Sequence, residues 1–198
     1  REFKQPENMI LPITAYGSTV LKQVAEEIDK DYDGLNQLIA DMFETMYAAE
    51  GVGLAAPQVN KSIRLFVIDA SPFADKFPEL LEFKKVFINP YIVEYAGKEE
   101  VVDEGCLSIP NVREYVPRKT EILIEYYDEN WVFHEEQYSG TAARIIQHEY
   151  DHIEGVLFVE RINNLRKAII RRKLHEITKG EVDVDYKMMF PVQKRKKW

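Results

Sequence analysis

Apolar residues recur at helical spacing between residues 33 and 49, and they mark the clearest element of the chain. Six of them fall on one helical face, namely Leu35, Leu38, Ile39, Met42, Phe43 and Met46. Gly51 follows and ends the predicted helix. Residues 63–70 are instead almost continuously apolar, which is typical of a buried strand.

The rest of the chain alternates short β-type runs with turns and two more helical patterns. We expect further strands at 9–11, 86–89, 91–95 and 157–159, and a hairpin made of 121–127 and 131–138. Pro90 separates two of these strands, because proline cannot donate a hydrogen bond within a sheet. We expect helices at 141–153, with Ser139 as N-cap, and from Asn164 to Gly180. No repeat, low-complexity linker or second hydrophobic core is visible, so the pattern predicts a single α+β domain.

The predicted helix at 141–153 carries the stretch Gln147-His148-Glu149-Tyr150-Asp151-His152, which contains the pattern H-E-x-x-H. Two histidines four residues apart lie one turn apart on the same face and can bind one metal ion. Glu149 can then act as a base on a metal-bound water. The alternative is a polar helix face on which two of the four histidines fall at this spacing by chance. A metal site therefore needs a third ligand elsewhere in the chain.

Cys106 is the only cysteine and the best candidate for the third ligand. Metalloproteases with a histidine six residues after the second one are excluded, because Phe158 occupies that position. Other candidates lie in segments with no further features of a site: His134, His175, Glu160 and Glu176. Gly105 lets the backbone approach closely, and a thiolate is a strong metal ligand. One cysteine and two histidines leave a coordination position open for catalysis, whereas the alternative is a buried, inert cysteine.

A loop of small residues spans 51–58 and reads Gly-Val-Gly-Leu-Ala-Ala-Pro-Gln. It superficially resembles a dinucleotide-binding fingerprint, but a helix precedes it and Pro57 follows, so nucleotide binding is rejected. Small residues would let the main chain run close to a substrate. Gln58 could then direct an amide N–H at a developing oxyanion, where one donor contributes roughly 2.7–4 kcal/mol. The alternative is a tight structural turn.

Composition narrows the class of protein. The 198 residues are 45% hydrophobic and 30% charged, which is ordinary for one globular domain. A disulfide-stabilised scaffold is excluded, and no apolar run suits a membrane span or a signal peptide, so we expect a cytoplasmic protein without a membrane partner. The net charge is −8, yet residues 161–198 hold 12 Lys/Arg against 4 Asp/Glu. This basic end either binds a polyanion or is a solvated helix face followed by a lysine-rich end.

Three stretches in sequence order resemble the signatures of bacterial-type peptide deformylases. They are 51–58, which matches G-x-G-x-A-A-x-Q, 104–108, which matches E-G-C-L-S, and 147–152, which matches Q-H-E-x-D-H. The similarity extends from about Met9 to Gly180, so we expect a catalytic domain at 9–180 and a basic tail at 181–198. The resemblance implies antiparallel sheets packed around a central H-E-x-x-H helix, with a C-terminal helix.

The resemblance also implies a role for each matching residue. The metal ligands would be Cys106, His148 and His152, with Fe²⁺ expected and Zn²⁺, Ni²⁺ or Co²⁺ as alternatives that the ligand types do not exclude. Glu149 would be the general base and then the acid, and Gln58 and the Leu107 backbone N–H would stabilise the oxyanion. The substrate would contact Val52, Gly53, Val102, Glu104, Arg113 and Ile145. Thr141 and Arg144 stand where many relatives have other residues, so the pocket differs in shape.

The implied reaction removes the N-formyl group from the initiator methionine of a nascent peptide and releases formate. The basic last helix resembles that of members that dock on the ribosome. Three alternatives remain open: a metallopeptidase that cuts internal peptide bonds, a structural metal domain, and a ribosome-binding module. A structural metal site would need a fourth protein ligand, which the three signatures do not supply.

Overall fold

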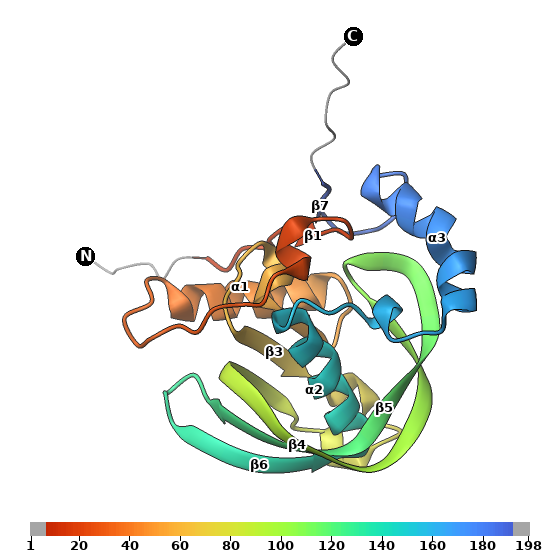
Figure 1. Ribbon diagram of the computed structural model, residues 1–198. Coiled ribbons are helices and arrows are strands. Elements are labelled where there is room, and N and C mark those ends of the chain that lie inside the picture. The colour runs from red at the N-terminus through yellow and green to blue at the C-terminus, as the bar shows by residue number, and fades with distance from the viewer. Residues whose placement is uncertain (1–6, 192–198) are drawn as a thin grey trace.

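A five-stranded antiparallel sheet organises the fold, and the computed structural model describes it within residues 7–191 (Figure 1). The strand order is β2-β3-β4-β5-β6. The strands are β2 (Gly53–Ala55), β3 (Leu65–Asp69), β4 (Lys84–Cys106), β5 (Ile109–Tyr127) and β6 (Phe133–Ser139). The predicted strand at 63–70 and the predicted hairpin are both confirmed. The fold is the single α+β domain that the sequence predicts.

β4 is much longer than the sequence predicts. We expected a break at Pro90, but this residue lies inside the strand, and so does the turn-like stretch 96–98, which contains Gly97. The register against β5 shifts between Ile88 and Tyr91 and again between Ala96 and Glu99. Such irregularities accommodate a proline and bend a strand without ending it. β4 and β5 therefore curve around α2 (Figure 1).

The three predicted helices are confirmed as α1 (Leu35–Ala48), α2 (Gly140–Ile153) and α3 (Asn164–Thr178). Asn163, and not Asn164, is the N-cap of α3, because its side chain accepts a hydrogen bond from the Arg166 N–H at 2.9 Å. The predicted strand at 157–159 is wrong, since Phe158–Glu160 forms a single 3₁₀ turn. None of the described helices has both the length and the apolar character needed to cross a membrane.

Apolar packing fixes α2 against the sheet. One buried cluster joins α2 to the sheet and includes Ile146, Phe66 and Phe87. Another lies beyond the C-terminal end of α2 and includes Phe158 and Ile170, with Cys106 packed against it. A helix packed against a sheet in this way has little freedom to move, so the side chains that it presents keep fixed positions.

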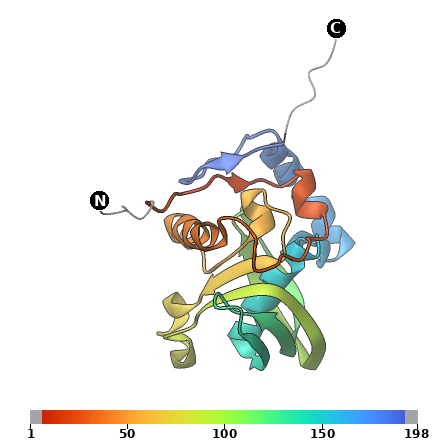
Figure 2. The same cartoon turned by 90° about the vertical axis from the view of Figure 1, so that its left-hand side faces the viewer.

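Residues 181–191 belong to the packed body. β7 (Met188–Met189) pairs in parallel with β1 (Ile13–Thr14), as Figure 2 shows, and β1 replaces the strand expected at 9–11. Residues 181–191, which we assigned to a basic tail, hold three acidic residues and one lysine. Val182, Met188 and Phe190 pack against the same buried cluster as Cys106 does. The rest of the expected tail, 192–198, lies outside the described residues.

Candidate active site and metal centre

Cys106, His148 and His152 come together at the end of β4 and on one face of α2. Their potential ligand atoms all lie within 4.8 Å of one another. The Cys106 sulfur and the His152 Nε2 atom are 3.3 Å apart. The two histidines are neighbours because they are four residues apart on α2, with ring centroids separated by 5.2 Å. The sequence-predicted ligands therefore form one cluster.

This cluster fits a divalent metal ion. Metal–sulfur and metal–nitrogen bonds of about 2.0–2.3 Å place the donors of a tetrahedral site about 3–4 Å apart. The Cys106–His152 distance of 3.3 Å lies in this range, and the whole set of donors lies within 4.8 Å. Three protein donors of this kind leave a further position open, which distinguishes catalytic from structural sites. Beside them, the Glu149 Oε2 atom is buried and has no hydrogen-bond partner among the described residues. An unpartnered carboxylate oxygen next to an open position can accept a hydrogen bond from a reacting water.

A buried carboxylate orients the first histidine. The Glu104 Oε2 atom lies 3.0 Å from His148 Nδ1, which leaves the other ring nitrogen for a metal. Burial opposes ionisation of Glu104, but hydrogen bonds from His148 and Arg118 outweigh it and hold the pKa of Glu104 well below its ordinary value. Glu104 is therefore an ionised acceptor at neutral pH, and we assigned it to the substrate pocket without this role.

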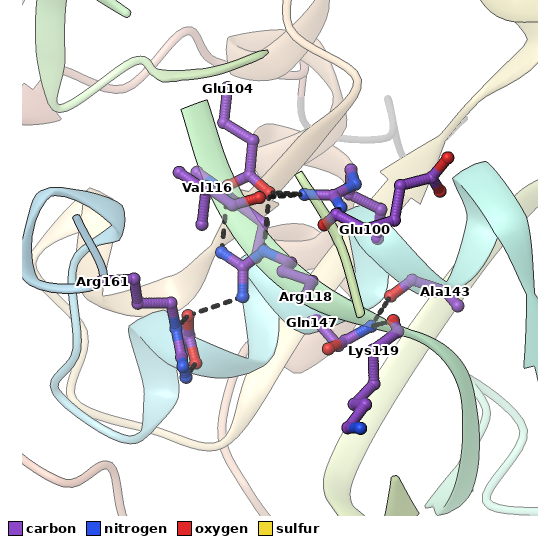
Figure 3. A network of polar contacts seen from close by, with 11 residues as sticks. Glu100, Glu104, Val116, Arg118, Lys119, Ala143, Gln147 and Arg161 are labelled. Atoms are coloured by element: carbon purple, nitrogen blue, oxygen red, sulfur yellow. Dashed lines mark hydrogen bonds and ion pairs between the residues drawn. The ribbon is translucent and has the colours of Figure 1, made fainter. Parts of the chain in front are cut away.

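Arg118 connects Glu104 to α2 (Figure 3). Its Nε and Nη2 atoms contact both oxygens of Glu104 at 2.6 and 3.0 Å, and its Nη1 atom contacts Asp151 at 2.9 Å. Arg161 contacts both oxygens of Asp151 at 2.6 Å. Sequence reasoning missed this network. Asp151 lies inside the signature at 147–152 and could have been singled out from the sequence. Arg118 lies outside all three signatures, so no sequence pattern pointed to it.

Glu149 lies against the edge strand β2. Its side chain is 4% exposed, and burial raises its pKa to about 7. An ideal Cβ atom on Gly53 would lie 2.5 Å from the Glu149 Oε1 atom. Glycine at this position therefore lets the backbone approach the carboxylate closely.

Gln58 also faces the cluster. Its Oε1 atom accepts a hydrogen bond from the Ala55 N–H at 2.9 Å, which fixes the orientation of the amide. Its Nε2 atom then points at the Ser108 hydroxyl, at 3.2 Å, and at the Cys106 sulfur, at 3.6 Å. The small-residue loop therefore delivers an N–H donor beside the predicted metal ligands.

Comparison with known proteins decides the family. The model of the polypeptide deformylase family matches residues 10–168. The chain belongs to the polypeptide deformylase family. It is therefore an enzyme, and the resemblance seen in the three signatures is confirmed.

The similarity to individual deformylases covers nearly the whole chain. The chain is 56% identical to the peptide deformylase of Christiangramia forsetii, over 94% of this chain and 99% of that protein. It is 53% identical to that of Flavobacterium psychrophilum, over 94% of this chain and 100% of that protein. A solved peptide deformylase structure from Legionella pneumophila aligns with a TM-score of 0.76 at 37% identity, covering 87% of this chain and 97% of that chain. These alignments agree with the single domain observed.

The expected substrate contacts of this deformylase lie around the cluster at different depths. Val52 packs against the buried cluster that contains Ile145, so these two are neighbours of one apolar region. Val102 is 36% exposed on β4. Arg113 is exposed and pairs with Asp103 at 2.6 Å. Val52 and Ile145 are therefore apolar neighbours, whereas Arg113 is a charged residue at the surface.

Gly53→Ala tests the close approach of β2 to Glu149. The added methyl group would overlap the carboxylate and displace it, and a shift of about 1 Å in a reacting group can lower the rate by about 100-fold. We expect kcat to fall by about 10–100-fold with unchanged metal content. Gly34→Ala is the control for destabilisation alone. Its φ of 72° makes an alanine strained, but the Cβ atom meets no described atom within 4 Å, so kcat should not fall in this variant. Wild-type activity in Gly53→Ala would show that Glu149 does not need its observed position.

Proposed function

We propose that this deformylase hydrolyses the N-formyl group of the initiator methionine of nascent peptides and releases formate and a free amino terminus. One observation carries the proposal: the cluster of Cys106, His148 and His152 lies beside a buried glutamate with a free oxygen. This arrangement suits hydrolysis of a small carbonyl group, and membership of the deformylase family indicates which carbonyl it is.

Cys106, His148 and His152 would hold one divalent ion. When bound, such an ion makes water acidic enough to act as a nucleophile near neutral pH and polarises a carbonyl oxygen. Glu104 keeps His148 in the tautomer that leaves its Nε2 atom available. From the family resemblance we propose Fe²⁺ as the native ion, with Zn²⁺, Ni²⁺ or Co²⁺ as substitutes. The ligand types do not choose among these ions, because imidazole suits several of them and thiolate favours zinc.

Glu149 is the proposed proton carrier. It takes a proton from the attacking water, the water oxygen bonds to the formyl carbon, and the same proton then passes to the leaving amine nitrogen as the C–N bond breaks. The raised pKa of Glu149, about 7, suits a group that both accepts and returns a proton near neutral pH.

Gln58 and Leu107 are the proposed oxyanion donors. The Gln58 Nε2 atom already faces the cluster, so its N–H requires little reorientation to meet a negative oxygen. The Leu107 backbone N–H directly follows the Cys106 ligand in the chain. We assign Val52, Gly53, Val102, Ile145 and the aliphatic part of Glu104 to the methionine pocket, and Arg113 to the peptide beyond it.

The decisive experiment measures formate release from a formyl-Met peptide and cleavage of the same peptide without the formyl group. We expect formate from the first and no reaction with the second. Chelation should remove the activity, and addition of each metal under low oxygen should rank the ions. Cleavage of the unformylated peptide would instead support an endopeptidase, and activity that survives complete metal removal would contradict the metal site.

The ribosome is a proposed partner, and the cytoplasm the proposed location. The described part of α3 carries five basic residues in its middle, namely Arg166, Lys167, Arg171, Arg172 and Lys173. Leu165 and Ile169 are 71% and 56% exposed on the same helix. Basic residues around exposed apolar side chains are suited to binding a partner whose surface consists of both RNA and protein. Co-sedimentation with ribosomes that weakens as salt increases would support this partner.

A further inference from the structure

The turn that joins β4 to β5 consists of Leu107 and Ser108. Two-residue hairpin turns usually need positive φ angles so that the strands keep their natural twist. Among the described residues, the positive φ angle nearest to this turn is 61° at Asn111, outside it. The turn therefore lacks the favoured backbone conformation, and contacts from elsewhere in the molecule have to hold it.

Three distant parts of the chain supply those contacts. The Ser108 hydroxyl accepts from Gln58 Nε2 at 3.2 Å, and the Ser108 carbonyl oxygen accepts from the Tyr16 N–H at 2.9 Å. The Leu107 carbonyl oxygen accepts from the Tyr186 hydroxyl at 2.7 Å. Tyr186 therefore contacts the turn from 79 residues further along the chain.

The segment that carries Tyr186 is firmly anchored. The Ile13 and Ala15 N–H groups donate to its carbonyl oxygens at Lys187 and Met189, at 2.9 and 2.8 Å. The Asn111 side chain donates to the Asp183 carbonyl oxygen at 3.0 Å. Bonds on both sides of Tyr186 fix the backbone from which its hydroxyl reaches the turn. The segment lies beyond residue 168, where the match to the family model ends.

We infer that Tyr186 is a positioning residue that fixes the Leu107–Ser108 peptide and thereby directs the Leu107 N–H at the reacting carbonyl. The inference rests on the oxyanion role proposed for that N–H. The Leu107 carbonyl group and the Leu107 N–H share the Leu107 Cα atom. Loss of the bond to Tyr186 would let this Cα atom and the peptide on each side of it move, so the direction of the N–H would change. Burial and the charge of Cys106 raise the pKa of the Tyr186 hydroxyl, which keeps it a donor at neutral pH.

Tyr186→Phe tests the role in the zinc-loaded full chain, because it removes the hydroxyl and keeps the ring. We expect kcat for formate release to fall roughly tenfold, since one hydrogen bond that holds the turn is lost, with unchanged KM and zinc content. Loss of general packing would instead lower the melting temperature and the zinc content, and would move KM together with kcat.

Two single-residue NMR signals report the turn directly. Leu-Ser occurs once in the sequence, and Cys106 is the only cysteine. Carbonyl-¹³C leucine with ¹⁵N serine therefore isolates the Leu107–Ser108 peptide, and carbonyl-¹³C cysteine with ¹⁵N leucine isolates the Leu107 N–H. We expect both signals of the zinc-loaded protein to shift in Tyr186→Phe.

Tyr91→Phe is the matched control, because the Tyr91 hydroxyl donates to Glu27 at a similar 2.8 Å away from the cluster. It should leave kcat and both signals unchanged. The inference is overturned if Tyr186→Phe has wild-type kcat, or if the Leu107 N–H signal stays in place. Absence of formate release by the wild-type enzyme would overturn the proposed function instead, and the two NMR signals would still test the positioning of the turn.

Discussion

Glu149→Gln is expected to lower kcat for formate release by about 10²–10⁴-fold while the metal content stays unchanged. Glutamine has nearly the same size, so the close contact with Gly53 and the packing of α2 are retained. Its amide cannot accept a proton from water or return one to the leaving amine. Steady-state kinetics with a formyl-Met peptide, combined with metal analysis, measures both expectations.

Glu154→Gln is the control for loss of a carboxylate next to the same helix. Glu154 is the residue after α2 and pairs with Arg64 at 2.7 Å, away from the cluster. This variant should keep its activity. Near-normal turnover in Glu149→Gln would remove Glu149 from the mechanism, and loss of metal in that variant would mean that the glutamate acts as a ligand.

Arg118→Met is expected to lower the free energy of unfolding by about 3–5 kcal/mol, because it removes the buried cation that Glu104 and Asp151 share. Glu104 then keeps only its contacts with Arg144 and His148, and Asp151 keeps only its contact with Arg161. The side chains of Arg118, Glu104 and Asp151 are 2%, 7% and 6% exposed, so water cannot replace the lost contacts. For a domain of this size the melting temperature should fall by about 6–20 °C. The metal affinity should also fall, by about 10–100-fold, because Glu104 would no longer orient His148 as firmly.

Urea unfolding, thermal unfolding and metal competition measure these effects. Arg172→Met is the matched control, because Arg172 also pairs with a glutamate, at 2.9 Å, but is 90% exposed. An exposed pair of this kind contributes about 0.3–0.5 kcal/mol, so the control should be nearly as stable as the wild type. Equal stability of the two variants would show that the buried contacts of Arg118 stabilise the fold no more than an exposed ion pair does.

The sequence predicted α1 well because this helix buries one face, and burial of one face leaves a period that a single sequence shows. In α3 only Ile170 and Ile177 are buried, so the asparagine before it and Gly180 after it were the better signals. The sequence predicted β4 poorly. Pro90 and the stretch 96–98 have the local properties of chain breaks, but pairing with β5 carries the strand through both as irregularities of register. The prediction of a strand at 157–159 was wrong because a short apolar run can be buried equally well in a 3₁₀ turn.

The sequence by itself determined the family and predicted which cysteine and histidines gather in one cluster. H-E-x-x-H is a local pattern on one helix, and the three signatures are read directly from neighbouring residues. Only the tertiary structure decided how these residues are supported. Glu104 contacts Arg118 and His148, and Tyr186 contacts Leu107, across separations of 14 to 79 residues. Such contacts depend on how the curved strands and the C-terminal segment come together in three dimensions, and no period or spacing along the chain encodes them.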